Sequence, residues 1–209
     1  QALADKLKVK LEVVPTNPAN RVPLLVSGKV DLVVANFTIS EERAKQVDFS
    51  IPYFASGQQF IVKQGTALEK PEDLNNVGVD KGTVNEGVIR SQFPGATVVA
   101  YDDTPFAFAA LRNGNVQAIT QDGPKLIGLL ANVPDRDKYV IPPFTVSEDL
   151  IGIGIPKGEA ALKKVVDEAL LELEKSGKAE QIYNAWFGPD TKTPLKRLYK
   201  IGQEKPQAK

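Results

Sequence analysis

Residues 25–31 read LVSGKVD and residues 111–117 read LRNGNVQ, so leucine, glycine and valine return with the same spacing. In both stretches the glycine follows an apolar-periodic segment, at the position where helices commonly end, and a short apolar run comes next. The expected strands before the two stretches, at 9–14 and 97–101, also correspond. We interpret this match as an internal repeat of two similar α/β lobes.

The rest of the chain alternates short apolar runs with amphipathic segments, as α/β proteins do. We expect strands at residues 9–14, 30–35, 60–63, 77–79, 97–101, 116–120 and 150–155. We expect helices at residues 2–7, 20–27, from 40, 70–74, from 83, from 104, 160–176 and 178–186. The expected lobes are residues 1–56 plus 148–209 for the first and residues 57–147 for the second.

The repeat predicts a gap in the first lobe. The second lobe has a strand at 77–79 and a turn before its first helix, whereas the first lobe begins inside the corresponding helix. We therefore expect an N-terminally incomplete lobe, whose runs at 9–14 and 30–35 lack a central neighbour. The strand would come from a missing N-terminal segment, a second polypeptide or a second copy; alternatively, the lobe simply has no such strand.

Composition excludes several classes of function. The 209 residues are 42% hydrophobic, and 26 basic residues balance 26 acidic ones, so no global positive field indicates a nucleic-acid binder. No stretch reaches the roughly 18 apolar residues that a membrane helix needs. The chain has neither Cys nor His, which excludes thiolate nucleophiles and the Ser-His-Asp triad and removes the commonest metal ligands. We expect no metal site and no cofactor. The absence of Met indicates a processed chain or a fragment.

The first candidate site follows the expected strand at 30–35, in the stretch ANFTISEER from Ala35 to Arg43. Open α/β sheets bind ligands at the carboxyl ends of their strands. Ser40 is a good N-cap, and Arg43 stands in the first helical turn, where the helix dipole disfavours a cation. A bound anion at this turn would explain the arginine. A surface arginine paired with Asp48 or Glu41 explains it equally well.

The second candidate site lies at the matching ends of strands in the other lobe. After the expected strand at 77–79, Thr83 and Glu86 have the spacing of a capping box, which is a structural role by itself. Asp122 follows the expected strand at 116–120, where its carboxylate either caps the next helix or faces a ligand ammonium. An arginine on one lobe and an aspartate on the other suit a zwitterion.

These stretches resemble the family-3 periplasmic amino-acid-binding proteins, the receptors of ABC importers. The resemblance rests on VDLVVANFTISEERAKQVDFSIP at 30–52 together with VGVDKGTVNE, AFAALRNGNVQAITQD, GIGIPKGE and SGKAEQIYNAWFG, which follow in the family's order. It implies a type II periplasmic-binding-protein-like fold, with two α/β lobes joined by two hinge strands and a ligand trapped in the cleft. The family's opening strand has no counterpart here, in agreement with the repeat.

The resemblance also implies roles for single residues. Arg43 grips the ligand's α-carboxylate with the help of Thr38 and of the backbone N–H groups near Val84, and Asp122 takes the α-ammonium. The carbonyl of Asn36 is a second acceptor. The remaining ligand-binding candidates are Thr83 and Asn85, beside Val84, with Phe54 and Arg21. Phe54 is more easily explained by packing, and Arg21 either reads the ligand's side chain or lies on the surface.

The resemblance implies a non-catalytic receptor that captures a free polar amino acid, acidic or small and polar, and delivers it to the membrane subunits of an ABC importer. It also implies a secreted protein, periplasmic or extracellular, from which a signal peptide has been removed. One alternative is an enzyme on the same scaffold that resembles cyclohexadienyl dehydratase, with Glu86 or Asp122 as general acid. Another is a ligand-sensing domain of a receptor or channel.

Overall fold

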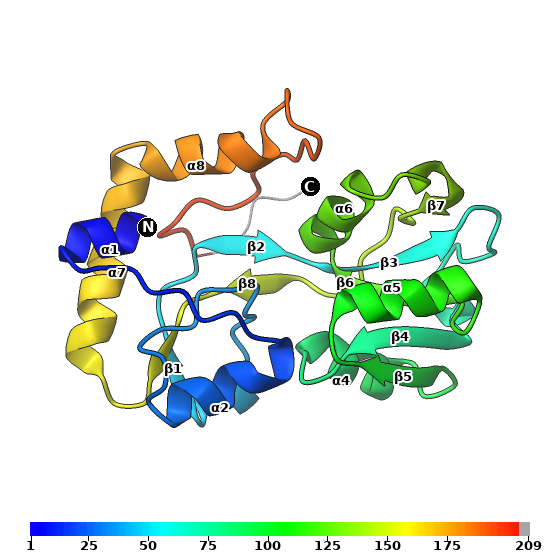
Figure 1. Cartoon of the computed structure of the whole chain (residues 1–209), viewed down its shortest axis with the longest axis horizontal. Helices are drawn as coiled ribbons and strands as arrows, with labels where there is room; N and C mark the ends of the chain where they lie inside the picture. The colour runs from blue at the N-terminus through cyan, green and yellow to red at the C-terminus, as the bar shows by residue number, and fades with distance from the viewer. Residues whose placement is uncertain (205–209) are drawn as a thin grey trace. The chain divides into compact units, whose positions relative to one another are not determined.

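The computed structural model of the chain describes residues 1–204 and divides the chain into two compact units (Figure 1). Unit 1 comprises Gln1–Thr16, Asn20–Ala55 and the chain from Leu150 on, and unit 2 comprises Asn17–Ala19 and Ser56–Asp149. Two of the boundaries between the units fall within β2 (Phe54–Ser56) and β8 (Asp149–Ile151), which pair with each other, and the others lie on either side of Asn17–Ala19. Within residues 1–204, no helix has the length and apolar character needed to cross a membrane.

Unit 2 is built on a five-stranded sheet in the order β5-β4-β6-β3-β7. Its strands are β3 (Gln58–Lys63), β4 (Asn76–Asp80), β5 (Thr97–Tyr101), β6 (Ala118–Asp122) and β7 (Tyr139–Val140). Its helices are α4 (Val84–Gln92), α5 (Thr104–Asn113) and α6 (Gly123–Ala131), with 3-10 turns at Pro71–Asp73 and Arg136–Lys138. Strand β4 pairs in parallel with β5 and β6, so the carboxyl ends of β4 and β6 lie at the same edge.

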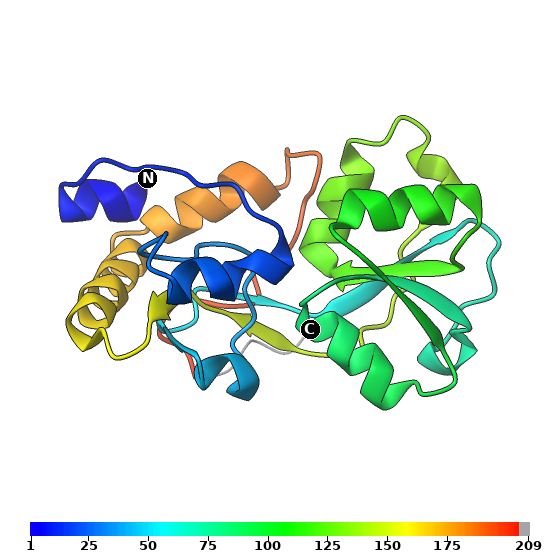
Figure 2. The same cartoon turned by 60° about the horizontal axis from the view of Figure 1, so that its bottom comes forward.

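Alternation along β3 divides the core of unit 2 into two layers. Phe60 and Val62 point to the face that Ile89 of α4 covers, whereas Ile61 points to the opposite face, which Leu111 of α5 covers. Figure 2 shows α5 and α4 on opposite sides of this sheet. A strand that is apolar at successive positions is therefore buried on both faces, as in doubly wound α/β folds.

Unit 1 has less regular structure around its core. Its helices are α1 (Ala2–Leu7), α2 (Arg21–Val26), α3 (Glu41–Ala44), α7 (Ala160–Lys175) and α8 (Lys178–Phe187), and Pro18–Asn20 forms a 3-10 turn before α2. Strands β1 (Val47–Phe49) and β9 (Gly154–Pro156) form an antiparallel pair. One core cluster is centred on Phe37 and Leu25, and another joins Ile155 to Val166 of α7.

The two glycines of the sequence repeat end their helices as expected. Gly28 follows α2 with φ at 69°, and Gly114 follows α5 with φ at 79°. These left-handed conformations favour glycine because it carries no Cβ. Residues 25–31 and 111–117 therefore share a helix end of the same kind.

Two strand predictions for unit 1 are wrong. Residues 9–17 form neither helix nor strand, and the stretch at 30–35 makes a single β-bridge, between Val33 and Gly154. A strand is held by backbone bonds to a neighbour, and within residues 1–204 no neighbouring strand reaches the 9–14 run. The strand expected at 150–155 is two strands, β8 and β9, separated at residues 152 and 153.

Candidate functional site

Arg43 is held in place at the start of α3. Ser40 is the N-cap of this helix, and its hydroxyl accepts a hydrogen bond from the backbone N–H of Arg43 at 3.3 Å. The Arg43 side chain donates from Nη1 to the carbonyl of Thr38 at 2.9 Å, and its guanidinium carbon lies 4.5 Å from the centre of the Phe37 ring. A bond to a carbonyl and a stacked ring fix a guanidinium in one orientation.

The alternative that Arg43 is a surface residue paired with Asp48 is wrong. Arg43 is 9% exposed, and Asp48 binds Lys157 at 2.8 Å and the backbone N–H of Gly158 at 2.8 Å. These two bonds hold the pKa of Asp48 below its ordinary value. Arg43 thus presents a buried guanidinium in a fixed place, and its planar fork has the geometry that binds a carboxylate.

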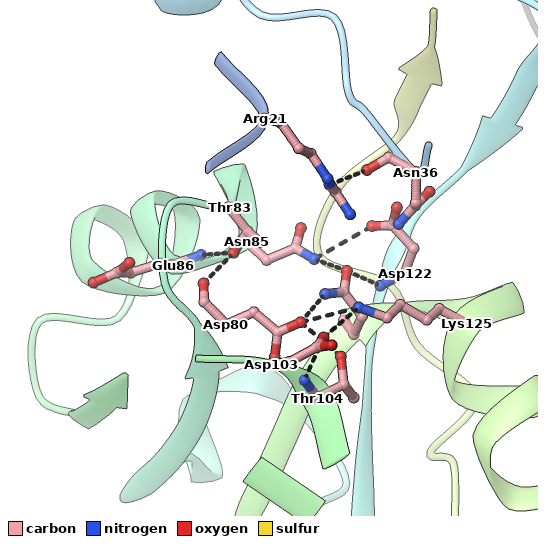
Figure 3. Close-up of polar contacts among 11 residues, drawn as sticks. Arg21, Asn36, Asp80, Thr83, Asn85, Glu86, Asp103, Thr104, Asp122 and Lys125 are labelled. Atoms are coloured by element: carbon pink, nitrogen blue, oxygen red, sulfur yellow. Dashed lines mark hydrogen bonds and ion pairs between the residues drawn. The ribbon is translucent and has the colours of Figure 1, made fainter. Parts of the chain in front are cut away.

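Asn36 and Thr38 lie beside this arginine in unit 1. The Nη1 group of Arg21 donates to the carbonyl of Asn36 at 2.9 Å (Figure 3). Arg21 is 9% exposed, so the surface interpretation of this residue is wrong as well. Thr38 is buried and forms a β-bridge with Ile151. Asn36, Thr38 and Arg43 thus lie in one segment of the chain, and Arg21 at the start of α2 contacts that segment.

Tyr53 forms a hydrogen bond with the residue directly before Asn36. Its hydroxyl donates to the carbonyl of Ala35 at 2.9 Å. Burial raises the pKa of Tyr53 to about 12, against the opposing effect of the nearby Arg21 charge. The hydroxyl is therefore a neutral donor at physiological pH, and it anchors the backbone directly before Asn36.

Phe54 packs against the helix α8. Its ring centre lies 6.0 Å from that of Tyr183 and 6.0 Å from that of Phe187, and these two rings are 5.1 Å apart. The contacts account for an aromatic residue at this position through packing. The contribution of Phe54 to ligand binding stays a prediction.

In unit 2, Thr83 caps the helix α4. The Thr83 hydroxyl accepts from the N–H of Glu86 at 3.3 Å and donates to the carbonyl of Asp80 at 2.7 Å. Glu86 accepts from the N–H of Gly82 at 3.3 Å and forms an ion pair with Arg90 at 3.0 Å. The first N–H groups of the helix, which begins at Val84, have no partners within the helix. They are suited to an anion.

Asp122 ends strand β6 and is 2% exposed. Its side chain makes no capping bond to α6, so the capping interpretation is wrong. Instead, its Oδ1 accepts from Nδ2 of Asn85 at 3.3 Å, and the same Nδ2 group donates to Oε1 of Gln121 at 2.8 Å. Asn85 is itself 1% exposed. The structure therefore brings two of the candidates of unit 2, Asn85 and Asp122, into direct contact.

The sequence interpretation missed Asp80 and Lys125, which lie near these residues (Figure 3), and Gln121, which binds Asn85 and Asp80. Asp80 Oδ2 accepts from Gln121 Nε2 at 2.8 Å, from Lys125 Nζ at 3.0 Å and from the Thr104 hydroxyl at 2.6 Å. Asp80 is 1% exposed, although it is a charged residue. The sequence could have indicated Asp80, because it is the last residue of the apolar run NVGVD that forms β4, as Asp122 is the last residue of β6.

Each unit by itself carries groups that can bind a charged ligand. Unit 1 offers buried guanidinium groups, which bind carboxylates. Unit 2 offers a helix N-terminus and a buried carboxylate, which binds an ammonium. Glu86, one of the two candidate general acids, is committed to Arg90 and the Gly82 N–H.

The chain is similar in sequence to a family of binding proteins. Residues 1–189 match the model of the bacterial extracellular solute-binding proteins, family 3. The chain is 32% identical to the ABC transporter glutamine-binding protein GlnH of Bacillus subtilis (strain 168), over 90% of this chain and 68% of the relative. It is 34% identical to the L-cystine-binding protein TcyJ of Escherichia coli (strain K12), over 91% of this chain and 72% of the relative.

Among solved structures, an ancestral arginine-binding protein bound to glutamine is similar, with a TM-score of 0.85 and 38% sequence identity. The similarity covers 90% of this chain and 84% of that one. These matches confirm the type II fold and the resemblance that the sequence motifs indicated. The chain belongs to the bacterial extracellular solute-binding proteins, family 3.

Proposed function

We propose that this chain is a non-catalytic receptor that captures a free polar amino acid outside the cytoplasm and delivers it to an ABC importer. The observation that carries the proposal is the pair of buried, oppositely charged side chains, Arg43 at the start of α3 and Asp122 at the end of β6. A guanidinium held in one orientation suits a carboxylate, and a carboxylate suits an ammonium. The names of the two relatives, both binding proteins, support the same role.

The proposal assigns the two charged groups of an amino acid to these side chains. Arg43 binds the α-carboxylate, with Thr38 and the N–H groups around Val84 as further donors. Asp122 binds the α-ammonium, with the Asn36 carbonyl as a second acceptor. The fixed orientation of Arg43 supports this assignment, because a preorganised group loses less entropy when the ligand binds.

We further propose that the ligand is acidic, or small and polar, and that Arg21 reads its side-chain carboxylate or amide. Arg21 is 9% exposed and donates from Nη1 to the carbonyl of Asn36 at 2.9 Å, so its guanidinium lies at the segment that carries Asn36 and Thr38. A guanidinium binds carboxylate and amide oxygens, which supports a ligand of this class.

Titration calorimetry with L-glutamate, L-aspartate, L-glutamine, L-cystine and L-arginine tests this function. We expect one ligand per chain and the tightest binding for L-glutamate or L-aspartate. Incubation with prephenate or arogenate separates the receptor from the dehydratase alternative, and turnover of either compound would contradict the receptor function. Absence of binding by every amino acid would contradict it too.

We also propose that unit 1 takes up a further extended segment, supplied by another stretch of polypeptide or by a second copy. Val9, Val13 and Val34 are 57%, 72% and 60% exposed, which is unusual for valines in apolar runs. Residues 9–17 make no strand, and the run at 30–35 makes one bridge. A parallel strand next to these runs would cover the valines and supply partners for the backbone.

A further inference from the structure

A buried relay of side-chain amides runs through unit 2 from Asp80 to Asp122 (Figure 3). Asp80 accepts from the Nε2 group of Gln121, and the Oε1 atom of Gln121 accepts from Asn85 Nδ2 at 2.8 Å. The same Asn85 Nδ2 group reaches Asp122 Oδ1 at 3.3 Å. Asp80, Asn85, Gln121 and Asp122 are each at most 3% exposed. The relay is therefore shielded from water. In such a buried place hydrogen bonds are stronger than in water, and their directions matter.

The carboxylate of Asp80 at one end of the relay fixes the orientation of the Gln121 amide. A carboxylate accepts hydrogen bonds and donates none, so the Gln121 amide must turn its nitrogen toward Asp80. Its oxygen then faces two donors, the Asp122 backbone N–H at 3.0 Å and Asn85 Nδ2. The reverse orientation would place the Gln121 nitrogen against both donors and its oxygen against a carboxylate. Asp80 and the Asp122 N–H thus together fix which way Gln121 points, and the Gln121 oxygen and the Asp122 carboxylate together fix which way Asn85 points.

Asp80 is in turn fixed by partners outside the relay. Its Oδ2 atom accepts from the Thr104 hydroxyl at 2.6 Å and from Lys125 Nζ at 3.0 Å. Lys125 also approaches Asp103 at 3.5 Å and is 30% exposed. The ammonium places an opposite charge beside the buried carboxylate and, with the Thr104 hydroxyl, holds in place the oxygen that accepts from Gln121.

We propose that Asp80 is a positioning residue for ligand binding: through Gln121 and Asn85 it orients the carboxylate of Asp122 toward the ligand ammonium. The proposal rests on the amino-acid-binding function proposed above. Asp80 itself does not touch the ligand in this scheme. What it supplies is an acceptor of fixed place for Gln121; without it, Gln121 is held by fewer bonds, and the Asn85 Nδ2 group that reaches Asp122 loses a firmly placed second acceptor.

The test compares variants that remove the acceptor with one that keeps it. In calorimetry with L-glutamate and L-glutamine, Asp80→Leu should weaken binding about tenfold, the usual effect of one buried hydrogen bond. Asp80→Asn, which retains an oxygen for Gln121, should lose less than Asp80→Leu. Asp102→Leu is the matched control, because Asp102 is exposed, pairs with Lys81 and should leave the affinity unchanged.

A double-mutant cycle separates positioning from a general structural role. If Asp80 acts through Asn85, Asp80→Leu should have almost no effect in an Asn85→Ala background. Equal losses in both backgrounds would overturn the proposal. Gln121→Met, which breaks the relay while leaving Asp80 its bonds to Lys125 and Thr104, repeats the cycle if Asp80→Leu fails to fold.

A ligand-free readout keeps this proposal distinct from the proposed function. The Asn85 side-chain amide signals in nuclear magnetic resonance spectra should shift and exchange faster with solvent in Asp80→Leu or Gln121→Met, and not in Asp102→Leu. Unchanged Asn85 signals would overturn the relay, whatever the chain binds. Loss of binding in Asp122→Asn with no loss in Asp80→Leu would likewise overturn positioning and leave the receptor function standing. If Asp122→Asn has no effect on binding, the ammonium assignment itself fails.

Discussion

The guanidinium carbon of Arg43 lies 4.5 Å above the centre of the Phe37 ring. Phe37 is fully buried and packs on Phe49 at 5.2 Å, so the ring is a rigid platform. The carbonyl of Thr38 fixes the arginine from another side at 2.9 Å. Arg43 is therefore held in one orientation, as its proposed role in binding a ligand carboxylate requires.

Replacing Arg43 tests this placement. Arg43→Ala should weaken amino-acid binding by about 2–5 kcal/mol, the usual loss for one partner of a buried charge pair. Arg43→Lys should weaken it as well, because an ammonium lacks the planar fork that binds a carboxylate with two bonds. Calorimetry measures both effects. Arg90→Ala, at an exposed ion pair of unit 2, is the control, and equal affinities for all four proteins would show that Arg43 does not touch the ligand.

Arg21 tests the ligand class. If its guanidinium reads a side-chain carboxylate or amide, Arg21→Ala should weaken L-glutamate, L-aspartate and L-glutamine by about tenfold or more and L-alanine and L-serine much less. Competition binding against one labelled ligand gives the five ratios directly. The same loss for every ligand would mean that Arg21 acts through its bond to the Asn36 carbonyl, which every amino acid would share.

Helix ends were predictable because their signals are local. Gly28 and Gly114 take up the left-handed conformation that the repeat predicted, and Ser40 caps the helix that carries Arg43. In each case one residue type fits one backbone position. Arg43 in a first helical turn and Asp122 at the end of an apolar run could also be singled out from the sequence, and their roles in ligand binding stay predictions.

The amide relay and the strands of unit 1 were not predictable in the same way. The role of Asp80 depends on the orientation of Gln121, which comes from a different strand and is fixed by atoms far away in the chain. The run at 9–14 has strand-like composition, yet composition cannot supply the neighbour that a strand requires. Both features depend on contacts between segments that are far apart in the chain, whereas a sequence pattern describes each segment by itself.

Asp48 makes the stability of the chain depend on pH. Its pKa is lowered in the folded state by the bond from Lys157 and by the N–H of Gly158, so the folded state favours the charged form. The resulting stabilisation is present above the unfolded pKa near 3.8 and is lost as the pH falls through the lower folded value.

Asp48→Asn should therefore reduce the free energy of unfolding at pH 7 by about 0.2–1 kcal/mol, as for other pairs near the surface. Its stability should also fall less steeply than that of the unmodified chain from pH 5 to pH 3. Chemical denaturation at several pH values measures both quantities. Glu168→Gln, at a looser pair with Lys164 on α7, is the control, and a slope as steep in Asp48→Asn as in the unmodified chain would contradict the assignment.

Hydrogen exchange tests the strand-uptake proposal. In dilute solution, amides at residues 9–14 should exchange far faster than those of the paired strand β3, which serves as the internal reference. If a second copy supplies the strand, protection at 9–14 and 30–35 should rise with protein concentration together with the apparent mass. Protection at 9–14 equal to that of β3 in a dilute monomer would show that unit 1 needs no further strand.

The most direct measurement of the receptor function is the binding of L-glutamate beside two analogues that each lack one charged group. The 2-oxo analogue has no ammonium, and 4-aminobutyrate has no α-carboxylate. If Asp122 and Arg43 bind these groups, the unmodified chain should bind L-glutamate with one ligand per chain and both analogues at least about a hundredfold more weakly. Asp122→Asn should lose its preference for L-glutamate over the 2-oxo analogue, and Arg43→Ala its preference over 4-aminobutyrate. Equal binding of all three compounds to the unmodified chain, or unchanged preferences in both variants, would contradict the account.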